Sequence, residues 1–474
     1  MKKISKLITI VLILVLAFTL RLYKITNPIA DWHSFRQADT ASVTREFVKQ
    51  GINLWVPRYH DLSNIQSGKD NLSGYRMVEF PIINAGTALV IKVFGQSHEI
   101  LIGRLVSVFF SLLSIIALYY IGKKLSGEIT ALSAAFIFAV LPYSVYYSRV
   151  ILPEPAFLAL ICLSLAFFIS FLTRKSTPSF LLFFCCLTLA LLLKPFALFL
   201  FPVFISVAYY FHGKKIVNDW PIFIFLILAL VPLYFWRHWI LNFPTGIPAS
   251  DWLYNKDNIR FKGAFFHWLF EVRLSTLILG IGGLVPTVLG LIKRGSDHFV
   301  YLIWTLCLLA YSIIFAGGNV QHDYYQIIWL PLLCLLAGRG VQLLFMVPST
   351  ILNKHITTLT LVTLLIFSIF VSWYTVRGYY QINNPAIIFA GQAVDKLTPQ
   401  DAKIIAPYNG DTAFLFQTNR IGWPLGYYID DKIKQGASYY VSVSYDDEAR
   451  LLETKYAVVE KNKDYILINL SQPK

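Results

Sequence analysis

The chain has 474 residues, of which 56% are hydrophobic and only 14% are charged. Soluble domains carry about a quarter of charged residues, so the composition excludes an ordinary soluble protein and indicates an integral membrane protein. The formal net charge is +15, but the basic residues come in pairs between apolar runs, which is typical of a membrane-topology signal and not of nucleic-acid binding. The five cysteines have neither zinc-site nor disulfide spacing.

Apolar runs long enough to cross a membrane, which takes about 17 to 25 residues, occur repeatedly. We predict eleven spans, at residues 4–22, 100–122, 128–146, 155–172, 179–193, 196–212, 219–237, 274–292, 298–316, 323–342 and 357–376. The fifth and sixth spans meet at Lys194-Pro195, where we expect a tight turn. A cleaved signal peptide is the alternative for residues 1–22, but no small-x-small cleavage pattern follows the run, which favours an uncleaved anchor.

Basic residues gather in every second connection, and such loops face the cytoplasm. The residues are Lys2, Lys3 and Lys6, then Lys123/Lys124, Arg174/Lys175, Lys214/Lys215, Lys293/Arg294 and the stretch from Arg339 to Lys354. The pattern predicts that the loop 23–99 and the C-terminal region lie on the outer side of the membrane.

The first outer loop opens on the polar stretch DWHSFRQADTASVTREF at residues 31–47. Ser34 and Gln37 have the spacing of a capping box, and Gly51 is placed to end the helix that they would start. We therefore expect a helix over 35–50 that lies at the outer surface, with an apolar side suited to the membrane interface.

Within this helix Arg36 and Asp39, three residues apart, share a face. The pair is either an ordinary surface ion pair with a dipole-favoured acid or part of a site, and the residues alone leave both interpretations open. Glu79 stands in the same loop just before Pro81, at the predicted start of another helix that ends near Gly95.

Further polar residues fall at the outer ends of later spans. They are Arg149 and Glu154 in YYSRVILPEPAF, Lys194 in ALLLKPFALF, and His322, Asp323, Tyr324 and Tyr325 in GGNVQHDYYQIIWLP. Capping, snorkelling or an aromatic belt explains each alone, although an ionisable group at membrane depth is a candidate functional residue. Because the loop charges assign all of these features to one side, they predict an outward cavity lined by carboxylates and cations.

From about residue 377 the chain changes character. DAKIIAPY, ASYYVSVSY and DYILINL predict short strands, and FAGQAVDKL and DDEARLLE predict helices between them. We therefore expect two domains: a transmembrane domain over 1–376, including the outer loop 23–99 with surface helices, and a small α/β domain over 377–474 on the extracytoplasmic side.

The predicted cavity suits group transfer from a lipid-linked donor. Arg149, Lys194 and His322 could neutralise a phosphate at headgroup depth, and Asp39 could accept a proton from a hydroxyl. ATP and nucleotide sugars are not normally available outside a bacterial inner membrane. A donor that arrives in the lipid on a phosphate carrier leaves as an anion, which cations stabilise.

Several short motifs occur in a recognisable order over about residues 1–345. They are HSFRQADTA, EFP, FGQSHEILIGRLVS, SRVILPEP, LLKPFAL and HDYYQIIWLP. With these motifs the chain resembles the GT-C superfamily of polytopic glycosyltransferases, in particular the bacterial group that depends on polyprenyl-phosphate sugars and includes protein mannosyltransferases and aminoarabinose transferase-like enzymes.

The resemblance implies an α-helical polytopic GT-C-like fold and an inverting transfer from a polyprenyl-phosphate-linked sugar to a glycan, lipid or protein acceptor, with an acid of the first outer loop as base. Many relatives carry Asp-Glu at the start of the loop helix, where this chain has Arg36-Gln37. Asp39 is therefore the predicted base, with Asp31 as the runner-up. The second acid of the family maps onto Glu154.

The predicted substrate-binding residues are Arg36, Glu79, Arg149, Glu154, Lys194, His322 and Tyr325. Some relatives use a metal and others do not, so a divalent cation is an open cofactor prediction, with Glu79, Glu154 and His322 as candidate ligands. The expected location is the bacterial cytoplasmic membrane, with the active site on the extracytoplasmic side.

Two other classes of function remain to be weighed. A transporter or flippase of lipid-linked sugars would place polar residues along the spans and would show an internal repeat, whereas the charges here collect at one surface. A non-enzymatic assembly protein of the cell envelope is the other alternative.

Overall fold

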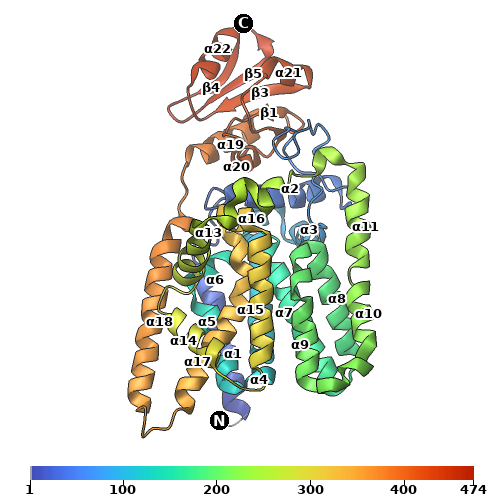
Figure 1. Cartoon of the computed structure of the whole chain (residues 1–474). Helices are drawn as coiled ribbons and strands as arrows, with labels where there is room; N and C mark the ends of the chain where they lie inside the picture. The colour runs from blue at the N-terminus through green and yellow to red at the C-terminus, as the bar shows by residue number, and fades with distance from the viewer. Residues whose placement is uncertain (1–2) are drawn as a thin grey trace. The chain divides into compact units, whose positions relative to one another are not determined.

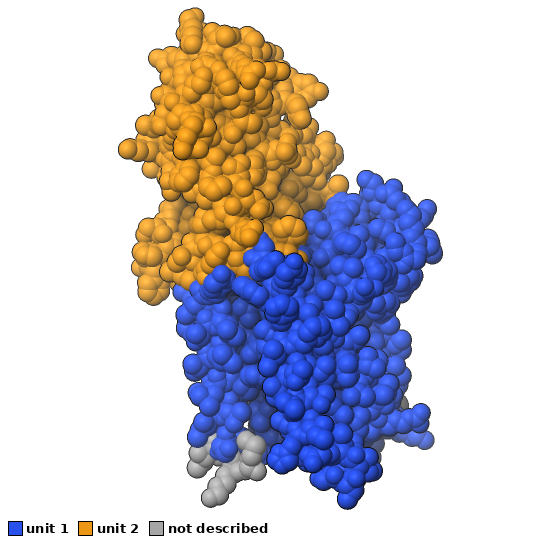
Figure 2. All heavy atoms as spheres, turned by 90° about the vertical axis from the view of Figure 1, so that its left-hand side faces the viewer, with its two compact units in different colours: residues 1–23, 105–236, 250–378 blue, residues 24–104, 237–249, 379–474 orange. Residues whose placement is uncertain are grey.

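The structure is a computed structural model that describes residues 3–474, so Lys2 of the predicted N-terminal basic cluster lies outside it (Figure 1). The chain divides into two compact units (Figure 2). Unit 1 extends to Tyr23 and then comprises Leu105–Trp236 and Ser250–Gly378, while unit 2 comprises Lys24–Arg104, Arg237–Ala249 and Tyr379–Lys474. Each unit is described by itself below.

Unit 1 is a bundle whose long helices run side by side (Figure 1). Its elements are α1 (Lys3–Arg21), most of α4 (Glu99–Leu125), α5 (Glu128–Val140), α6 (Pro142–Tyr147), α7 (Glu154–Arg174), α8 (Thr177–Leu193), η2 (Pro195–Leu200), α9 (Phe201–His212), η3 (Gly213–Asp219), α10 (Trp220–Leu228), α11 (Val231–Trp239), α12 (Asp251–Tyr254), η6 (Lys256–Phe261), α13 (Gly263–His267), the π-helix η7 (Trp268–Ile278), α14 (Leu284–Ile292), α15 (His298–Ile314), α16 (Ala316–Gln321), η8 (Asp323–Trp329), α17 (Leu330–Met346) and α18 (Lys354–Val376). Helices suit these apolar sequences because they satisfy every backbone polar group without water.

Each of the eleven predicted ranges contains helix. Within residues 3–474, six helical stretches are long and apolar enough to cross a membrane: Gln96–Leu125, Glu154–Arg174, Pro195–Ile216, Trp220–Asn242, Asp323–Met346 and Lys354–Tyr380. The number of crossings stays a prediction.

The predicted spans 128–146 and 274–292 are both interrupted. The first breaks at Leu141 because Pro142 cannot donate a backbone hydrogen bond. The second breaks between η7 and α14, where Gly280 and Ile281 have φ of 58° and 60°.

Arg21 stabilises the first of these breaks. The proline at position 142 leaves the carbonyl of Phe138 without its helical donor. The buried guanidinium of Arg21 donates to the carbonyl oxygens of Phe138 at 3.4 Å and Ala139 at 3.0 Å, and to Ser144 Oγ at 3.1 Å. Arg21 is thus a structural cap within unit 1.

Arg339 was assigned from the sequence to an inner loop, and that assignment is wrong. The residue lies inside α17 and is fully buried. Its guanidinium donates to both carboxylate oxygens of Asp297, at 2.9 and 2.8 Å, and to the carbonyl oxygen of Lys293 at 3.0 Å. A buried charge requires such partners, so Arg339 binds α17 to the loop before α15 and to the end of α14.

The helices α14 and α17 lie unusually close together. A Cβ added at Gly290 would lie 1.8 Å from the carbonyl oxygen of Leu336, and one at Gly340 would lie 1.9 Å from that of Pro286. Small residues at both positions permit this approach, as is common between membrane helices.

Unit 2 combines the first loop with the C-terminal region. Its elements are α2 (Ser34–Gln50), α3 (Ile82–Phe94), η1 (Gln96–His98), η4 (Ile240–Asn242), η5 (Pro244–Gly246), α19 (Ala386–Leu397), β1 (Lys403–Ile405), α20 (Thr412–Gln417), β2 (Ile421–Trp423), α21 (Ile429–Lys434), β3 (Ala437–Ser442), α22 (Asp447–Lys455), β4 (Tyr456–Lys461) and β5 (Ile466–Pro473), while η9 (Arg377–Tyr380) straddles the boundary with unit 1. The sheet order is β2-β1-β3-β5-β4, with β1 parallel to β2 and β3, and β5 antiparallel to β3 and β4.

The predicted strands and helices of the C-terminal region are confirmed as β1, β3, β5, α19 and α22. The short strand β2 was not predicted, and it is where the first loop joins the sheet. Gly422 of β2 receives a hydrogen bond from Leu62 N at 2.8 Å and donates one to the His60 carbonyl at 2.9 Å. Leu62 also enters the hydrophobic core of the sheet. The loop 23–99, predicted as part of the transmembrane domain, therefore groups with residues 379–474 in unit 2.

The helix α2 begins and ends where expected, but its predicted cap is wrong, and its position at the membrane surface stays a prediction. Gly51 ends it at φ 94°, whereas its N-terminus has no side-chain cap. Ser34 Oγ donates to Asp411 at 3.3 Å, and Gln37 Nε2 donates to Asp31 at 2.7 Å, so tertiary acceptors replace the capping box.

Both sides of α2 are covered within unit 2. Val43 and Phe47 pack against Tyr59, Ala85 and Ala88, and α20 contacts the helix as well as α3. Its polar residues are consequently buried and need partners.

We predict that Asp297→Ala lowers the free energy of unfolding by about 3–5 kcal/mol, because it leaves Arg339 as an unpaired buried charge. Thermal unfolding of the detergent-solubilised protein would measure the change. The control is Asp431→Ala, which breaks an exposed pair with Lys434 and should change stability by less than about 1 kcal/mol. Equal effects of the two variants would contradict the role assigned to Arg339.

Candidate active site

Two ion pairs join α2 to the segment before α3 in unit 2. In one pair α2 contributes the cation, and in the other it contributes the carboxylate. Arg36 of α2 binds Glu79, and Asp39, one helical turn later, binds Arg76 with 3.0 Å between Oδ2 and Nη2. Since the two residues on each side are three positions apart, the pairs lie next to each other and run antiparallel. We call these four residues the ion-pair clasp.

Asp39 is the most deeply buried residue of the clasp, with 1% of its side chain exposed. Besides Arg76, its carboxylate accepts hydrogen bonds from Thr412 Oγ1 at 2.7 Å and from Gln66 Nε2 at 3.5 Å. Thr412 begins α20, so the carboxylate of Asp39 joins three distant segments of unit 2. The predicted role of Asp39 as base stays a prediction.

Asp31, the alternative base, is also fully buried. Its carboxylate accepts hydrogen bonds from Gln37 Nε2 at 2.7 Å and Arg104 Nη2 at 3.1 Å. Arg104 donates as well to the carbonyl oxygens of Lys24 at 3.0 Å and Ile25 at 3.4 Å. The pair therefore holds the entry of the first loop against the first turns of α4.

Two further carboxylates of unit 2 are buried in unfavourable surroundings. Burial raises the pKa of Asp61 to about 6, and the charge of Asp39 adds to the rise. Burial likewise raises the pKa of Asp411 to about 6. Asp61 accepts a hydrogen bond from Ser63 N at 2.8 Å, and Asp411 accepts one from Ala413 N at 2.7 Å.

His60 and Glu46 form another pair missed by the sequence interpretation, with 3.3 Å between Nε2 and Oε1. Burial lowers the pKa of His60. Burial also acts to raise the pKa of Glu46, but the hydrogen bond and charge of His60, together with the charges of Lys49 and Arg45, lower it overall. His60 lies in the segment YHDLS, which is buried in the structure. Nothing in the sequence of this segment distinguishes it from an ordinary exposed loop.

In unit 1, Glu154 and Lys194 form a close pair, with 2.8 Å between Oε1 and Nζ. Glu154 opens α7, where the helix dipole favours a carboxylate. Lys194 follows α8 at the predicted turn, because Pro195 cannot continue the helix. The structure thus brings together two predicted substrate-binding residues, and Lys194 is buried rather than snorkelling.

Asp323 is the centre of a second cluster in unit 1. Its carboxylate accepts a hydrogen bond from the Tyr147 hydroxyl and lies 3.5 Å from Arg273 Nη1, while its carbonyl accepts one from the Tyr143 hydroxyl at 2.8 Å. The next residues stack, with the His322 ring 5.3 Å from that of Tyr324 and 6.2 Å from that of Tyr325. The aromatic rings hold His322 in a fixed orientation.

Arg149 is fully buried, and its guanidinium lies 5.2 Å from the centre of the Tyr146 ring. Arg273 was missed by the sequence interpretation. It projects from the π-helix η7, donates to the Val320 carbonyl at 3.2 Å and lies 5.0 Å from the Trp268 ring. The available signal was a single basic residue in the apolar stretch FEVRLSTLIL, at the edge of a predicted span.

The predicted metal ligands are held by other partners. Glu79 pairs with Arg36 and Glu154 pairs with Lys194, so each carboxylate is already neutralised by a cation. Among the residues whose side chains the structure describes, which leaves out 1–4 and 217–219, no group of three or more His, Cys, Asp and Glu is arranged to hold a metal ion. Metal dependence stays a prediction.

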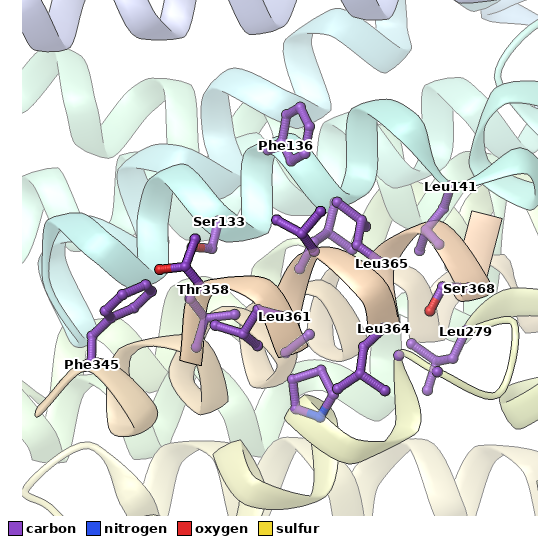
Figure 3. Close-up of a pocket in the computed structure, with 17 residues that line it drawn as sticks. Ser133, Phe136, Leu141, Leu279, Phe345, Thr358, Leu361, Leu364, Leu365 and Ser368 are labelled. Carbon is purple, nitrogen blue, oxygen red and sulfur yellow. The ribbon is translucent and has the colours of Figure 1, made fainter. Parts of the chain in front are cut away.

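An apolar cavity of about 230 Å³ lies among α5, α14, α17 and α18 of unit 1 (Figure 3). Phe136, Leu279, Phe345, Leu361 and Leu365 are among the residues that line it, and the hydroxyls of Ser133, Thr358 and Ser368 are its polar side-chain groups. Such a lining fits a hydrocarbon chain better than a sugar.

Comparison with known proteins supports a specific fold. Residues 80–239 match the family model described as dolichyl-phosphate-mannose-protein mannosyltransferase, a range that includes Arg149, Glu154 and Lys194. No curated protein sequence matches the chain. The crystal structure of ArnT from Cupriavidus metallidurans in the apo state matches with a TM-score of 0.66 and 13% identity, over 97% of each chain.

The chain has the fold of the GT-C glycosyltransferases. ArnT from the same organism bound to undecaprenyl phosphate matches with a TM-score of 0.64 and 15% identity, again over 97% of each chain. The archaeal oligosaccharyltransferase AglB from Archaeoglobus fulgidus, in complex with an inhibitory peptide and a dolichol-phosphate, matches with a TM-score of 0.59 and 10% identity, over 96% of this chain and 73% of that one. The predicted resemblance is confirmed, and the chain is a multi-pass membrane protein of the GT-C fold.

We predict that Asp61→Asn makes unit 2 more stable at neutral pH. Since the folded pKa is raised from 3.8 to about 6, Asp61 contributes stability below about pH 4, and this contribution is lost as the pH rises through 6. A shift of about two units corresponds to about 3 kcal/mol. Thermal unfolding at pH 4 to 8 should show a smaller decline for Asp61→Asn than for the wild type. Asp70→Asn, at an exposed position, is the control, and parallel curves for all three proteins would contradict the prediction.

Proposed function

We propose that the chain is a membrane glycosyltransferase that moves a sugar from a polyprenyl-phosphate donor to a glycan, lipid or protein acceptor. The transfer inverts the anomeric centre and takes place at the outer face of the bacterial cytoplasmic membrane, with a carboxylate of the loop 23–99 as base. In this proposal the C-terminal α/β region lies on the extracytoplasmic side.

The observation that carries the proposal is the fold match to ArnT over 97% of both chains, in one case with undecaprenyl phosphate bound. The cations at the helix ends of unit 1 are consistent with a lipid-phosphate ligand, because Lys194, Arg149 and Arg273 are each held by a carboxylate or an aromatic ring. The apolar cavity of unit 1 suits the hydrocarbon part of such a donor.

The chemistry follows from the charges of donor and product. The acceptor oxygen attacks the anomeric carbon of the sugar, and the bond from that carbon to the phosphate oxygen breaks. The leaving polyprenyl phosphate gains negative charge, which arginine and lysine stabilise, while the acceptor proton passes to a carboxylate. A single displacement of this kind inverts the configuration.

The test is turnover by the purified protein in lipid nanodiscs that contain a polyprenyl-phosphate sugar and a panel of candidate acceptors. Release of free polyprenyl phosphate together with a glycosylated acceptor, identified by mass spectrometry, is the expected result. A flippase would move the donor between leaflets without cleaving it, so transport with no release of lipid phosphate would overturn the proposal.

We predict that Lys194→Met together with Glu154→Gln raises the KM for the donor by about 10- to 100-fold, because the loss of a charge-assisted contact to phosphate costs about 1.5–3 kcal/mol. The double change removes both charges of the pair, so that neither is left buried alone. Initial rates at varied donor concentration measure the effect. Lys434→Met, at the exposed pair with Asp431, is the control, and an unchanged donor KM in the double variant would contradict the role of Lys194.

A further inference from the structure

We propose that Glu79 is the catalytic base and that Arg36 is its positioning residue, while the deeper pair of Asp39 and Arg76 anchors the segment that carries Glu79. The inference rests on the proposed function. It assigns the proton-accepting role to a different carboxylate from the two that the sequence interpretation favoured.

A general base must be an ionised carboxylate that an acceptor hydroxyl can reach within hydrogen-bond distance. Asp39 and Asp31 are poorly placed for this, since their side chains are 1% and 0% exposed. Each also accepts hydrogen bonds from an arginine and from a second donor at 2.7 Å. An acceptor would have to displace these donors to reach either carboxylate, at the cost of leaving them buried and unsatisfied.

Glu79 differs in exposure. Its side chain is 15% exposed, a larger value than those of Asp39 and Asp31. It stands two residues before Pro81, which precedes α3, so the rigid start of that helix limits the motion of its backbone. A carboxylate that is partly exposed and well fixed meets the geometric requirement for a base.

The clasp explains how Glu79 is held. Arg76 is buried and pairs with Asp39 in the interior, while its guanidinium lies 5.2 Å from the Tyr59 ring. Three residues later, Glu79 meets Arg36, whose side chain is 8% exposed. The inner pair thus fixes the segment, and the outer pair orients the Glu79 carboxylate.

Three of the other carboxylates of the first loop have different tasks. Glu46 is buried against His60, and Asp61 is buried with Ser63 as a donor. Glu99 is 18% exposed and, like Glu79, is bound by an arginine, since both Nη2 and Nε of Arg45 donate to it. Arg45 in turn donates to the Phe416 carbonyl at 2.7 Å and stacks 3.7 Å from the centre of that ring, so this pair is a packing contact.

In the reaction, the acceptor O–H bond breaks as the acceptor oxygen forms its bond to the anomeric carbon. The proton goes to the Glu79 carboxylate, and the electron pair of the bond between carbon and phosphate oxygen leaves with the polyprenyl phosphate. The protonated Glu79 then loses its proton to water before the next cycle.

The test compares Glu79→Gln with Glu99→Gln, because both break an arginine–carboxylate pair of similar exposure in unit 2. We expect Glu79→Gln to lower kcat by about 10²- to 10⁴-fold, the usual contribution of a general base, with the donor KM changed less than threefold. The acidic limb of the pH–rate profile should also disappear. Glu99→Gln should keep kcat within about threefold of the wild type, and Glu79→Asp should regain part of the lost rate.

The charge reversal Arg36→Glu with Glu79→Arg separates catalysis from structure. An ion pair that serves only stability tolerates reversal, so both the melting temperature and kcat would recover. If Glu79 is the base, the melting temperature recovers relative to Glu79→Arg alone and kcat does not.

Three outcomes would overturn the inference while leaving the proposed function intact. They are wild-type kcat in Glu79→Gln, full rescue of kcat by the charge reversal, and loss of turnover in Asp39→Asn or Asp31→Asn alongside retained turnover in Glu79→Gln. Failure of the wild-type protein to release polyprenyl phosphate in the same assay would instead refute the proposed function itself.

Discussion

The carboxylate of Asp39 is the contact on which unit 2 depends. It binds Arg76 of the segment before α3 and Thr412 of α20, and it belongs to α2 itself. These three segments are separated by up to several hundred residues in the chain, and a buried charge forces them together because it is costly without partners. The same rule operates at Asp31 with Arg104, at Glu154 with Lys194 and at Asp297 with Arg339. In each case a carboxylate and a cationic side chain from distant segments neutralise one another in the interior.

This rule also marks the limit of what the sequence could predict. Apolar runs are local signals, so helices appear in all eleven predicted ranges, and the strands β1, β3 and β5 appear where alternation indicated them. Partners of buried charges are not local. The predicted capping box failed because Ser34 donates to the distant Asp411, while Gln37 donates to the nearby Asp31. Arg339 was counted as a loop charge because nothing near it in the sequence identifies Asp297 as its partner.

The candidate site shows the same division between local and distant information. Residue types and their predicted position on the outer side were enough to select Arg36, Glu79, Glu154 and Lys194, and the structure pairs them two by two. The sequence alone could not indicate which carboxylate is the better candidate for the base, since that choice depends on how exposed each side chain is. Asp39 and Glu79 are both acids of the first loop, and only the fold reveals that one is enclosed by three donors whereas the other retains an exposed surface.

The pairing of acids with cations also suits the proposed chemistry. In the absence of donor, a cation that is to bind a lipid phosphate would be a buried charge without a counter-ion. Such a charge destabilises a fold by several kcal/mol. Glu154 removes that cost for Lys194, and Asp323 does so for Arg273. When a phosphate approaches, the cation can contact it while keeping its carboxylate neighbour, and that neighbour becomes a source of repulsion toward the same phosphate. In the proposed reaction the carboxylate would therefore limit how tightly the anionic product is held, so that an arrangement that stabilises the fold without donor would also favour release of the polyprenyl phosphate after transfer.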